Sequence, residues 1–343
     1  MFEIKSTLRL KFTWFLNSKD NLFLDIFVCL VTLTVAFSNI VQAQTYPDKQ
    51  IKLVVPTGPA GPTDIIARLL ADRMRVNLGQ AVVIENRVGA GGAIGAKYVA
   101  QSVPDGYTLL FGNTATLANI PAVSKSANYD PMTSFVAVAR AMDSYQVLVV
   151  SADLPVNSVA DLIQYLRVNS IHMNFGAAGV GNLTHLSGEL FKYKTNTNFE
   201  IIQYKSGAES INSILAGQTQ FTIDNISVVR PFIQDKRLKA LAVTATTRKP
   251  ELPDVPTMQE SGVNDLVISS FFGVVAPAGT SKVIVQRLNK SINEVLKSES
   301  LTDNFKRIGG QSVQESPEQF QSFIGSEMKK WTALSNDANV KID

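Results

Sequence analysis

The chain has 343 residues, of which 45% are hydrophobic and 18% are charged, and its formal net charge is +3. This balance excludes both an intrinsically disordered chain and a membrane protein with many spans. Lys and Arg are scattered rather than gathered with aromatic residues in a basic stripe, so nucleic acid is not an expected partner. The length suffices for a large core and for about two domains.

The first 43 residues have the pattern of a secretory signal peptide. Basic residues occur up to Lys19, an apolar run covers 26–37, and Val41-Gln42-Ala43 is a small-residue cleavage site. We therefore expect cleavage after Ala43 and a periplasmic protein; an uncleaved anchor over 22–41 is the alternative. The one cysteine, Cys29, lies in this leader, so the mature chain forms no disulfide.

The stretch that follows predicts a strand, a loop rich in glycine and proline, and a helix. The strand covers Ile51–Val55, and helical spacing begins at Ile65, with Thr63 or Asp64 expected to cap the helix. The loop holds no Lys or Arg, but free N–H groups at a helix start suit an anion. An ordinary strand-to-helix connection is the alternative. The candidate ligand-binding residues of this first loop are Thr57, Gly58, Pro59, Ala60, Gly61, Thr63 and Asp64.

Strands and helices are expected to alternate along the rest of the chain, which predicts an α/β fold with mostly parallel sheets. After the first helix, which should end near Gly79, a second strand is predicted to run parallel to the first. The predicted strands cover 81–85, 107–111, 135–141, 145–150, 200–204, 221–223, 241–244 and 271–276. The predicted helices cover 96–101, 159–166, 210–215 and 283–297, with one through Leu190 and a last one after Ser316. Ser158 is expected to be the N-cap of the helix 159–166, and Ser316-Pro317-Glu318 to cap the last helix.

A second glycine-rich loop has nearly the same composition as the first. It follows a short strand at Asn174, contains no basic residue, and ends at a helix start in Gly179, Gly181, Asn182, Thr184 and His185. Two such loops on different lobes would place two helix N-termini across a cleft. A ligand with two separated carboxylates could bridge them through charge-assisted hydrogen bonds.

The residues that catalysis would need are few. The chain has two histidines, no H-E-x-x-H motif and no G-x-S-x-G motif, so neither a metal site nor an enzyme is predicted, and no cofactor is expected. His185 either donates to a ligand or orients the second loop. Asp224 either caps a helix or selects an amine or hydroxyl group on the ligand.

A nucleotide-dependent oxidoreductase is the enzymatic alternative. Gly89, Gly91 and Gly95 approach a dinucleotide fingerprint, but the third glycine comes one residue too late for G-x-G-x-x-G. Export also makes a nicotinamide cofactor implausible. We therefore rank this alternative well below a binding protein.

Several ordered motifs together resemble the Bug family, the substrate-binding proteins of tripartite tricarboxylate transporters. The resemblance covers essentially the whole mature chain. The motifs are Tyr46-Pro47-x-Lys49-x-Ile51, the loop 56–64, Glu85-Asn86-Arg87-x-Gly89-Ala90-Gly91-Gly92, Pro104-Asp105-Gly106-Tyr107, Leu252-Pro253-Asp254-Val255-Pro256-Thr257 and Ala276-Pro277-Ala278-Gly279-Thr280.

The resemblance implies a two-lobed periplasmic binding protein of type II topology, with a ligand cleft between the lobes. Lobe one would comprise 46–145 and 271–343, and lobe two 146–270. The protein would capture a small organic dicarboxylate or an aromatic carboxylate by hinge closure and deliver it to a membrane permease. Presentation of the ligand to a sensor receptor is the alternative.

The resemblance also assigns roles to the candidate residues. One carboxylate would meet the first loop and the other end of the ligand would meet the second, with further wall residues at Thr114, Tyr204, Gly207, Asp224 and Asn225. Pro62 and Leu183 depart from the family pattern, since Pro62 lacks an N–H donor and Leu183 stands where the family usually has serine.

Overall fold

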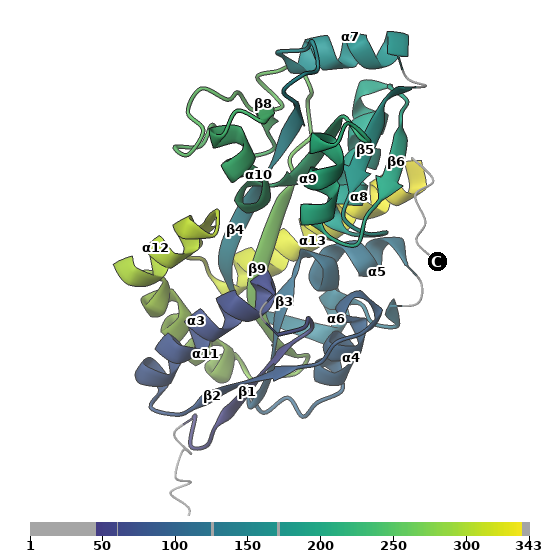
Figure 1. Ribbon diagram of the computed structural model, residues 1–343. Helices are drawn as coiled ribbons and strands as arrows, with labels where there is room; N and C mark the ends of the chain where they lie inside the picture. The colour runs from purple at the N-terminus through teal and green to yellow at the C-terminus, as the bar shows by residue number, and fades with distance from the viewer. Residues whose placement is uncertain (1–45, 60, 125–126, 170–171, 338–343) are drawn as a thin grey trace, which may run out of the picture. The chain divides into compact units, whose positions relative to one another are not determined.

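The computed structural model describes residues 46–59, 61–124, 127–169 and 172–337 (Figure 1). The predicted signal peptide, Cys29 and the candidate residue Ala60 lie outside these ranges. The described residues from Pro47 onward form one compact unit. Within the described residues, no helix is long and apolar enough to cross a membrane.

One sheet is built around β1 (Ile51–Val55). Strands β2 (Val82–Asn86) and β3 (Thr108–Asn113) pair with β1 in parallel, as predicted for β2. On the far side of β3, β9 (Ser269–Pro277) is antiparallel and pairs in turn with β4 (Phe135–Ser151). The short β10 (Gly310–Ser312) pairs with β4 in antiparallel fashion.

The far half of β4 belongs to a second sheet. Strand β5 (Asn174–Ala177) pairs in parallel with β6 (Glu200–Gln203) and with β7 (Phe221–Asn225). Both β7 and β8 (Leu238–Val243) are antiparallel to β4. The prediction of mostly parallel sheets was therefore wrong, because the repeated strand–helix units pair in parallel only within each half, whereas β4 and β9 join the halves in antiparallel fashion.

Strand β4 is continuous where the sequence predicts two strands. The polar residues Asp143 and Ser144 lie between the two predicted strands, yet they pair with Phe271 and Ser270 on β9. The same residues pair with β10 on the other side. Ladder partners on both sides keep the backbone extended whatever the local sequence prefers.

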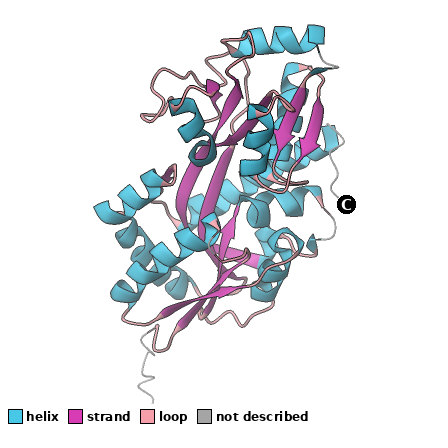
Figure 2. Cartoon of the chain, viewed as in Figure 1, coloured by secondary structure: helices cyan, strands magenta, loops and turns pink. Residues whose placement is uncertain are grey.

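Helices cover both sheets (Figure 2). All the predicted helices are present. The helices that the sequence analysis did not predict are short, and α10 has Pro231 inside it. The bounds are α3 (Pro62–Leu78), η1 (Ala90–Gly92), α4 (Ala93–Ala100), η2 (Ala115–Asn119), α5 (Ile120–Val123), α6 (Pro131–Ser134), α7 (Val159–Asn169), α8 (Leu183–Thr195), α9 (Gly207–Leu215), α10 (Ile226–Gln234), α11 (Lys282–Leu296), α12 (Glu299–Arg307) and α13 (Pro317–Asp337).

Predicted caps are confirmed at several helix ends. Gly79 adopts the left-handed conformation after α3, with φ of 70°. Ser158 accepts a hydrogen bond from Asp161 N at the start of α7, and Ser316 accepts one from Gln319 N at the start of α13. These local signals fix helix boundaries without tertiary help.

The core of the second sheet is aromatic. Phe175, Phe191, Phe199 and Phe221 have ring centroids 4.9 to 6.4 Å apart, and all are buried between β5, β7 and α8. Leu183 belongs to the same buried cluster. This departure from the family pattern therefore packs into the core.

Candidate ligand-binding site

Helix α3, which follows the first loop, begins earlier than predicted. Gly61 is the N-cap, with extended backbone, and Pro62 occupies the first helical turn. Thr63 and Asp64 therefore lie inside the helix, and the prediction that one of them caps it was wrong. Proline is favoured at this position because its fixed φ suits the helix and its missing N–H would have no intrahelical partner.

Asp64 is held by an arginine and an asparagine. Arg68 donates to both carboxylate oxygens at 2.8 and 3.0 Å, and Asn86 Nδ2 donates to Asp64 Oδ1 at 2.8 Å. The same amide nitrogen donates to Thr57 O at 3.0 Å, which ties the loop to the end of β2. Asp64 thus positions the first loop, and its charge is balanced by Arg68.

Neither nearby arginine is left for an anionic ligand. Arg68 binds Asp64, and Arg87 pairs with Glu85 while its guanidinium stacks 3.5 Å from the centroid of the Tyr98 ring. Any anion at this loop would be held by N–H and hydroxyl groups. Thr57 Oγ1 is buried and has no partner among the described residues.

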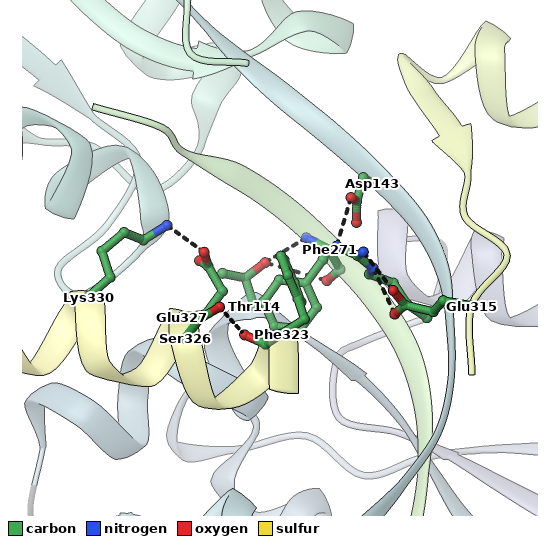
Figure 3. A network of polar contacts seen from close by, with 9 residues as sticks. Thr114, Asp143, Phe271, Glu315, Phe323, Ser326, Glu327 and Lys330 are labelled. Carbon is green, nitrogen blue, oxygen red and sulfur yellow. Dashed lines mark hydrogen bonds and ion pairs between the residues drawn. The ribbon is translucent and has the colours of Figure 1, made fainter. Parts of the chain in front are cut away.

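The end of β3 adjoins the first loop. Asn113 Nδ2 donates to Thr63 Oγ1 at 3.2 Å. Thr114 is 4% exposed, and its hydroxyl oxygen accepts from Phe271 N at 2.7 Å (Figure 3). Thr114 therefore joins β3 to β9. This hydrogen bond has a structural role, whether or not Thr114 also contacts a ligand.

The second loop closes on itself through hydrogen bonds. Ala178 N donates to Thr184 Oγ1 at 2.8 Å, and Gly181 N donates to His185 Nδ1 at 3.1 Å. Asn182 is the N-cap of α8. Gly179 and Gly181 have φ of 97° and 76°, a region that favours glycine because it lacks a Cβ.

His185 orients this loop, one of the two roles predicted for it. Burial lowers the pKa of the imidazole, so the ring is neutral at pH 7. Because Nδ1 accepts from Gly181, the proton of the neutral ring lies on Nε2. Nε2 is 3.9 Å from Glu189 Oε1.

The remaining candidates lie at the ends of β6 and β7, beside the second loop. Tyr204 N donates to Ala177 O at 2.8 Å, and Gly207 is the first residue of α9. Asn225 caps α10 by accepting from Ser227 N, so the helix cap, one of the two alternative roles predicted for Asp224, is wrong. Asp224 is 5% exposed.

The structure thus brings the candidates into two groups. The first group lies at the carboxyl ends of β1 and β3, and the second at the carboxyl ends of β5, β6 and β7, where open α/β sheets bind ligands. Both groups adjoin the strands that join the sheets. Asn113 is opposite Phe272 on β9, and Asn225 is opposite Gln146 on β4.

The two groups lie close along these joining strands. Tyr145, the neighbour of Gln146, is opposite Ser269. On β9, Ser269 therefore lies next to the second group and Phe272 lies opposite Asn113 of β3, next to the first group. The extended chain advances about 10 Å from Ser269 to Phe272. This is the scale of a small molecule with a carboxylate at each end.

Sequence reasoning missed Asn86 and Asn113. Both residues follow the apolar part of a strand next to β1, and their amides fix the first loop. Strand-end amides beside a glycine-rich loop are a signal that could have found them. Ser206, the N-cap of α9, was also missed; its hydroxyl accepts from Glu209 N at 3.2 Å.

Two surface hollows among the described residues are lined by none of the candidate residues. One, of about 420 Å³, is lined by 263–267 with Ala245 and Gln259. Another, of about 320 Å³, lies between α3 and α12 and includes Arg68 on its wall. Among the described residues, no cluster of three or more His, Cys, Asp or Glu could hold a metal ion.

Comparison with known proteins points to one family. The family model described as "Tripartite tricarboxylate transporter family receptor" matches residues 66–340. The protein BugT of Bordetella pertussis is 35% identical over 303 residues, which cover 88% of this chain and 93% of BugT.

Solved structures agree with the sequence match. An R. palustris protein solved with adipate is 36% identical, with a TM-score of 0.74 over 86% of this chain and 99% of that one. MatC from Rhodopseudomonas palustris, solved with bound malate, is 27% identical, with a TM-score of 0.71 over 84% of this chain and 99% of MatC. The fold is therefore that of a two-lobed periplasmic binding protein, and the chain belongs to the tripartite tricarboxylate transporter receptor family, the substrate-binding proteins that include the Bug proteins.

Proposed function

We propose that this protein captures a small aliphatic dicarboxylate in the periplasm and delivers it to the membrane permease of a tripartite transporter. The observation that carries the proposal is the pair of loop and helix-start groups that flank the joining strands, with both nearby arginines already bound to carboxylates. The adipate and malate in the related structures support this substrate class. The protein performs no chemistry on the ligand.

We further propose the lobe boundaries 46–145 with 271–343 for lobe one, and 146–270 for lobe two. The change of partner along β4 supports them, since Tyr145 is opposite Ser269 and Gln146 is opposite Asn225. At the same place Gln146 Nε2 donates to Ser270 Oγ at 3.0 Å. A bend there would bring the two groups together around the ligand and exclude water, which strengthens each hydrogen bond to a carboxylate.

The test is ligand binding to the protein purified from the periplasm. Adipate and malate should raise the melting temperature, and a ligand at 100 times its dissociation constant adds about 2.7 kcal/mol to the free energy of unfolding. NAD included in the same screen should have no effect. A shift with NAD alone would contradict the proposal and favour the oxidoreductase alternative.

A threonine pair on α8 makes the test specific. In the proposed site the Thr184 hydroxyl accepts from Ala178 N and donates its own proton to a ligand carboxylate. Thr184→Ala should therefore weaken binding about tenfold or more, the loss of one hydrogen bond to a charged group. Thr195→Ala, at the other end of the same helix, removes a hydroxyl that donates to Phe191 O and should leave the affinity unchanged. Equal effects of the two substitutions would place the ligand elsewhere.

A further inference from the structure

Asp224 has a carboxylate oxygen that no described residue satisfies. The side chain is 5% exposed at the end of β7. Oδ1 accepts from Asn225 N at 2.6 Å, whereas Oδ2 has no hydrogen-bond partner among the residues that the structure describes. A methyl group built on Gly207 would lie 2.9 Å from Oδ2, so this oxygen faces the first turn of α9, within the second group of candidate residues.

The charge of an ionised Asp224 would have no counterpart. Burial raises the pKa of its carboxyl to about 6, and the hydrogen bond from Asn225 N is the one opposing influence. The elements packed against β7 are β4, β5, α8, α9 and α10. Their titratable side chains contribute nothing to this shift; they are Arg140, Asp143, Tyr145, His185, Glu189, Lys192, Tyr193, Lys194, Glu209 and Arg230.

A dianionic ligand makes this arrangement unfavourable if Asp224 stays ionised. Two carboxylates that share a site without a cation repel each other, and one of them takes up a proton. A protonated Asp224 would instead donate a short, charge-assisted O–H···O⁻ hydrogen bond to the ligand. Protonation of Asp224 thereby removes its repulsion of the ligand carboxylate and provides a hydrogen-bond donor to it.

We propose that Asp224 binds the ligand as a neutral carboxylic acid and donates its proton to a ligand carboxylate, so that capture of a dicarboxylate takes up one proton from solvent. This inference rests on the proposed function. It makes Asp224 the residue that selects an anionic group over an ammonium group at this end of the ligand. An ammonium group would need the ionised form.

The experiment measures the affinity for adipate by calorimetry at pH 6.5, 7.5 and 8.5. Over this range adipate is dianionic and His185, with its lowered pKa, stays neutral. The affinity of the natural protein should fall by up to about tenfold for each pH unit, as expected when ligand binds one protonation state. Buffers of different ionisation enthalpy should report uptake of up to one proton per adipate bound.

Two variants isolate the residue. In Asp224→Asn the amide still donates a hydrogen bond but cannot titrate, so adipate should bind with an affinity that is independent of pH. Asp143→Asn is the matched control. Burial also raises the pKa of Asp143 to about 6, and its Oδ1 likewise has no hydrogen-bond partner within the described part of the chain, but it lies on β4 outside both groups. This control should keep the pH dependence of the natural protein.

Other outcomes would overturn the inference. Adipate affinity that is flat or rises with pH in the natural protein would show that Asp224 does not donate a proton. Tighter binding of 6-aminohexanoate than of adipate, lost in Asp224→Asn, would show that Asp224 accepts from a cation. If neither adipate nor malate binds at any pH, the proposed function itself fails; binding without pH dependence leaves that function standing and refutes only the role of Asp224.

Discussion

At the first loop an arginine is already paired with an aspartate, so an anion there would meet neutral groups. Arg68 balances Asp64, and Asn86 links Asp64 to the backbone of Thr57. The positive charge of Arg68 thus stabilises the loop through Asp64. In the proposed site, a ligand carboxylate at this loop would meet N–H groups and hydroxyls, whose direction the loop geometry determines.

Removal of Arg68 tests this role. Arg68→Ala removes the cation that balances Asp64, which is 2% exposed and keeps its hydrogen bond from Asn86. Because Arg68 is itself half exposed, the expected loss in the free energy of unfolding is about 1 kcal/mol. Adipate affinity should fall as well, because the loop loses its anchor.

The exposed pair of Arg248 and Glu260 provides the control. Its atoms are 3.0 Å apart, but both side chains are nearly half exposed. Arg248→Ala should therefore change stability less than Arg68→Ala and should not affect adipate binding. Urea titrations and calorimetry check both expectations, and an equal loss of adipate affinity in the two variants would refute the role of Arg68.

His185 makes stability depend on pH. Its folded pKa lies below the unfolded value of 6.5, so the unfolded chain binds the proton more readily. The contribution is fully present above pH 6.5 and is lost as the pH falls from there through the folded pKa. His185→Asn, which keeps an acceptor near Gly181 but does not titrate, should lose less stability than the natural protein between pH 7 and pH 5.

The measurement is a series of urea titrations across that pH range. Asp143 and Asp224 act in the opposite direction, because their raised pKa values make the folded state take up protons first. They are present in both proteins and cancel in the difference. Parallel stability curves for the two proteins would exclude His185 as the source.

At the scale of elements, close approach of α4 to β1 shapes the first loop. A methyl group on Gly95 would lie 2.8 Å from Arg87 O and 3.1 Å from Pro56 Cα. These are backbone atoms that cannot move without shifting the strand ends. Gly95, the third glycine of the approximate dinucleotide fingerprint, therefore serves packing around Pro56, and that fingerprint has no part in the proposed function.

Two helical glycines test this interpretation. Gly95→Ala should cost about 1–3 kcal/mol of stability through overpacking, and should weaken adipate binding because Pro56 carries the loop. Gly325→Ala, in α13, would place its methyl 3.3 Å from the flexible end of Met132, and should be neutral or stabilising because alanine favours helix. Thermal and urea unfolding of both variants decide the matter; equal stability of the two would refute the close-packing argument.

At the scale of the whole molecule, the proposed function requires the lobes to approach each other on binding. The sequence after residue 43 has no cysteine, so dye pairs can be placed freely in a Cys29→Ser background. Val76 in α3 and Val168 in α7 are 71% and 78% exposed and lie in different proposed lobes. Cysteines at these positions should show higher energy transfer with adipate than without it.

A second pair within lobe one is the control. Val283 in α11 is 76% exposed, and α11 packs on α3, so the Val76–Val283 pair should not respond to adipate. A change in both pairs would contradict the proposed boundaries. No change in either pair, with adipate bound, would contradict hinge closure.

The sequence by itself determined the local structure and the family. Caps at Gly79, Ser158 and Ser316, the parallel pairing of β1 with β2, and the two glycine-rich loops could all be predicted, because each depends on neighbouring residues. The ordered motifs were specific enough to indicate the family. These signals act over a few residues and survive without knowledge of the rest of the chain.

Only the tertiary structure decided what depends on distant partners. The continuity of β4 through Asp143 and Ser144 comes from β9 and β10 ladders more than 120 residues away in the chain. The hydrogen bond from Asn86 on β2 to Asp64 on α3, and the unsatisfied oxygen of Asp224 beside Gly207, likewise follow from packing between separate elements. Burial and hydrogen-bond partners set the charge and direction of a side chain, and neither can be read from the residue type alone.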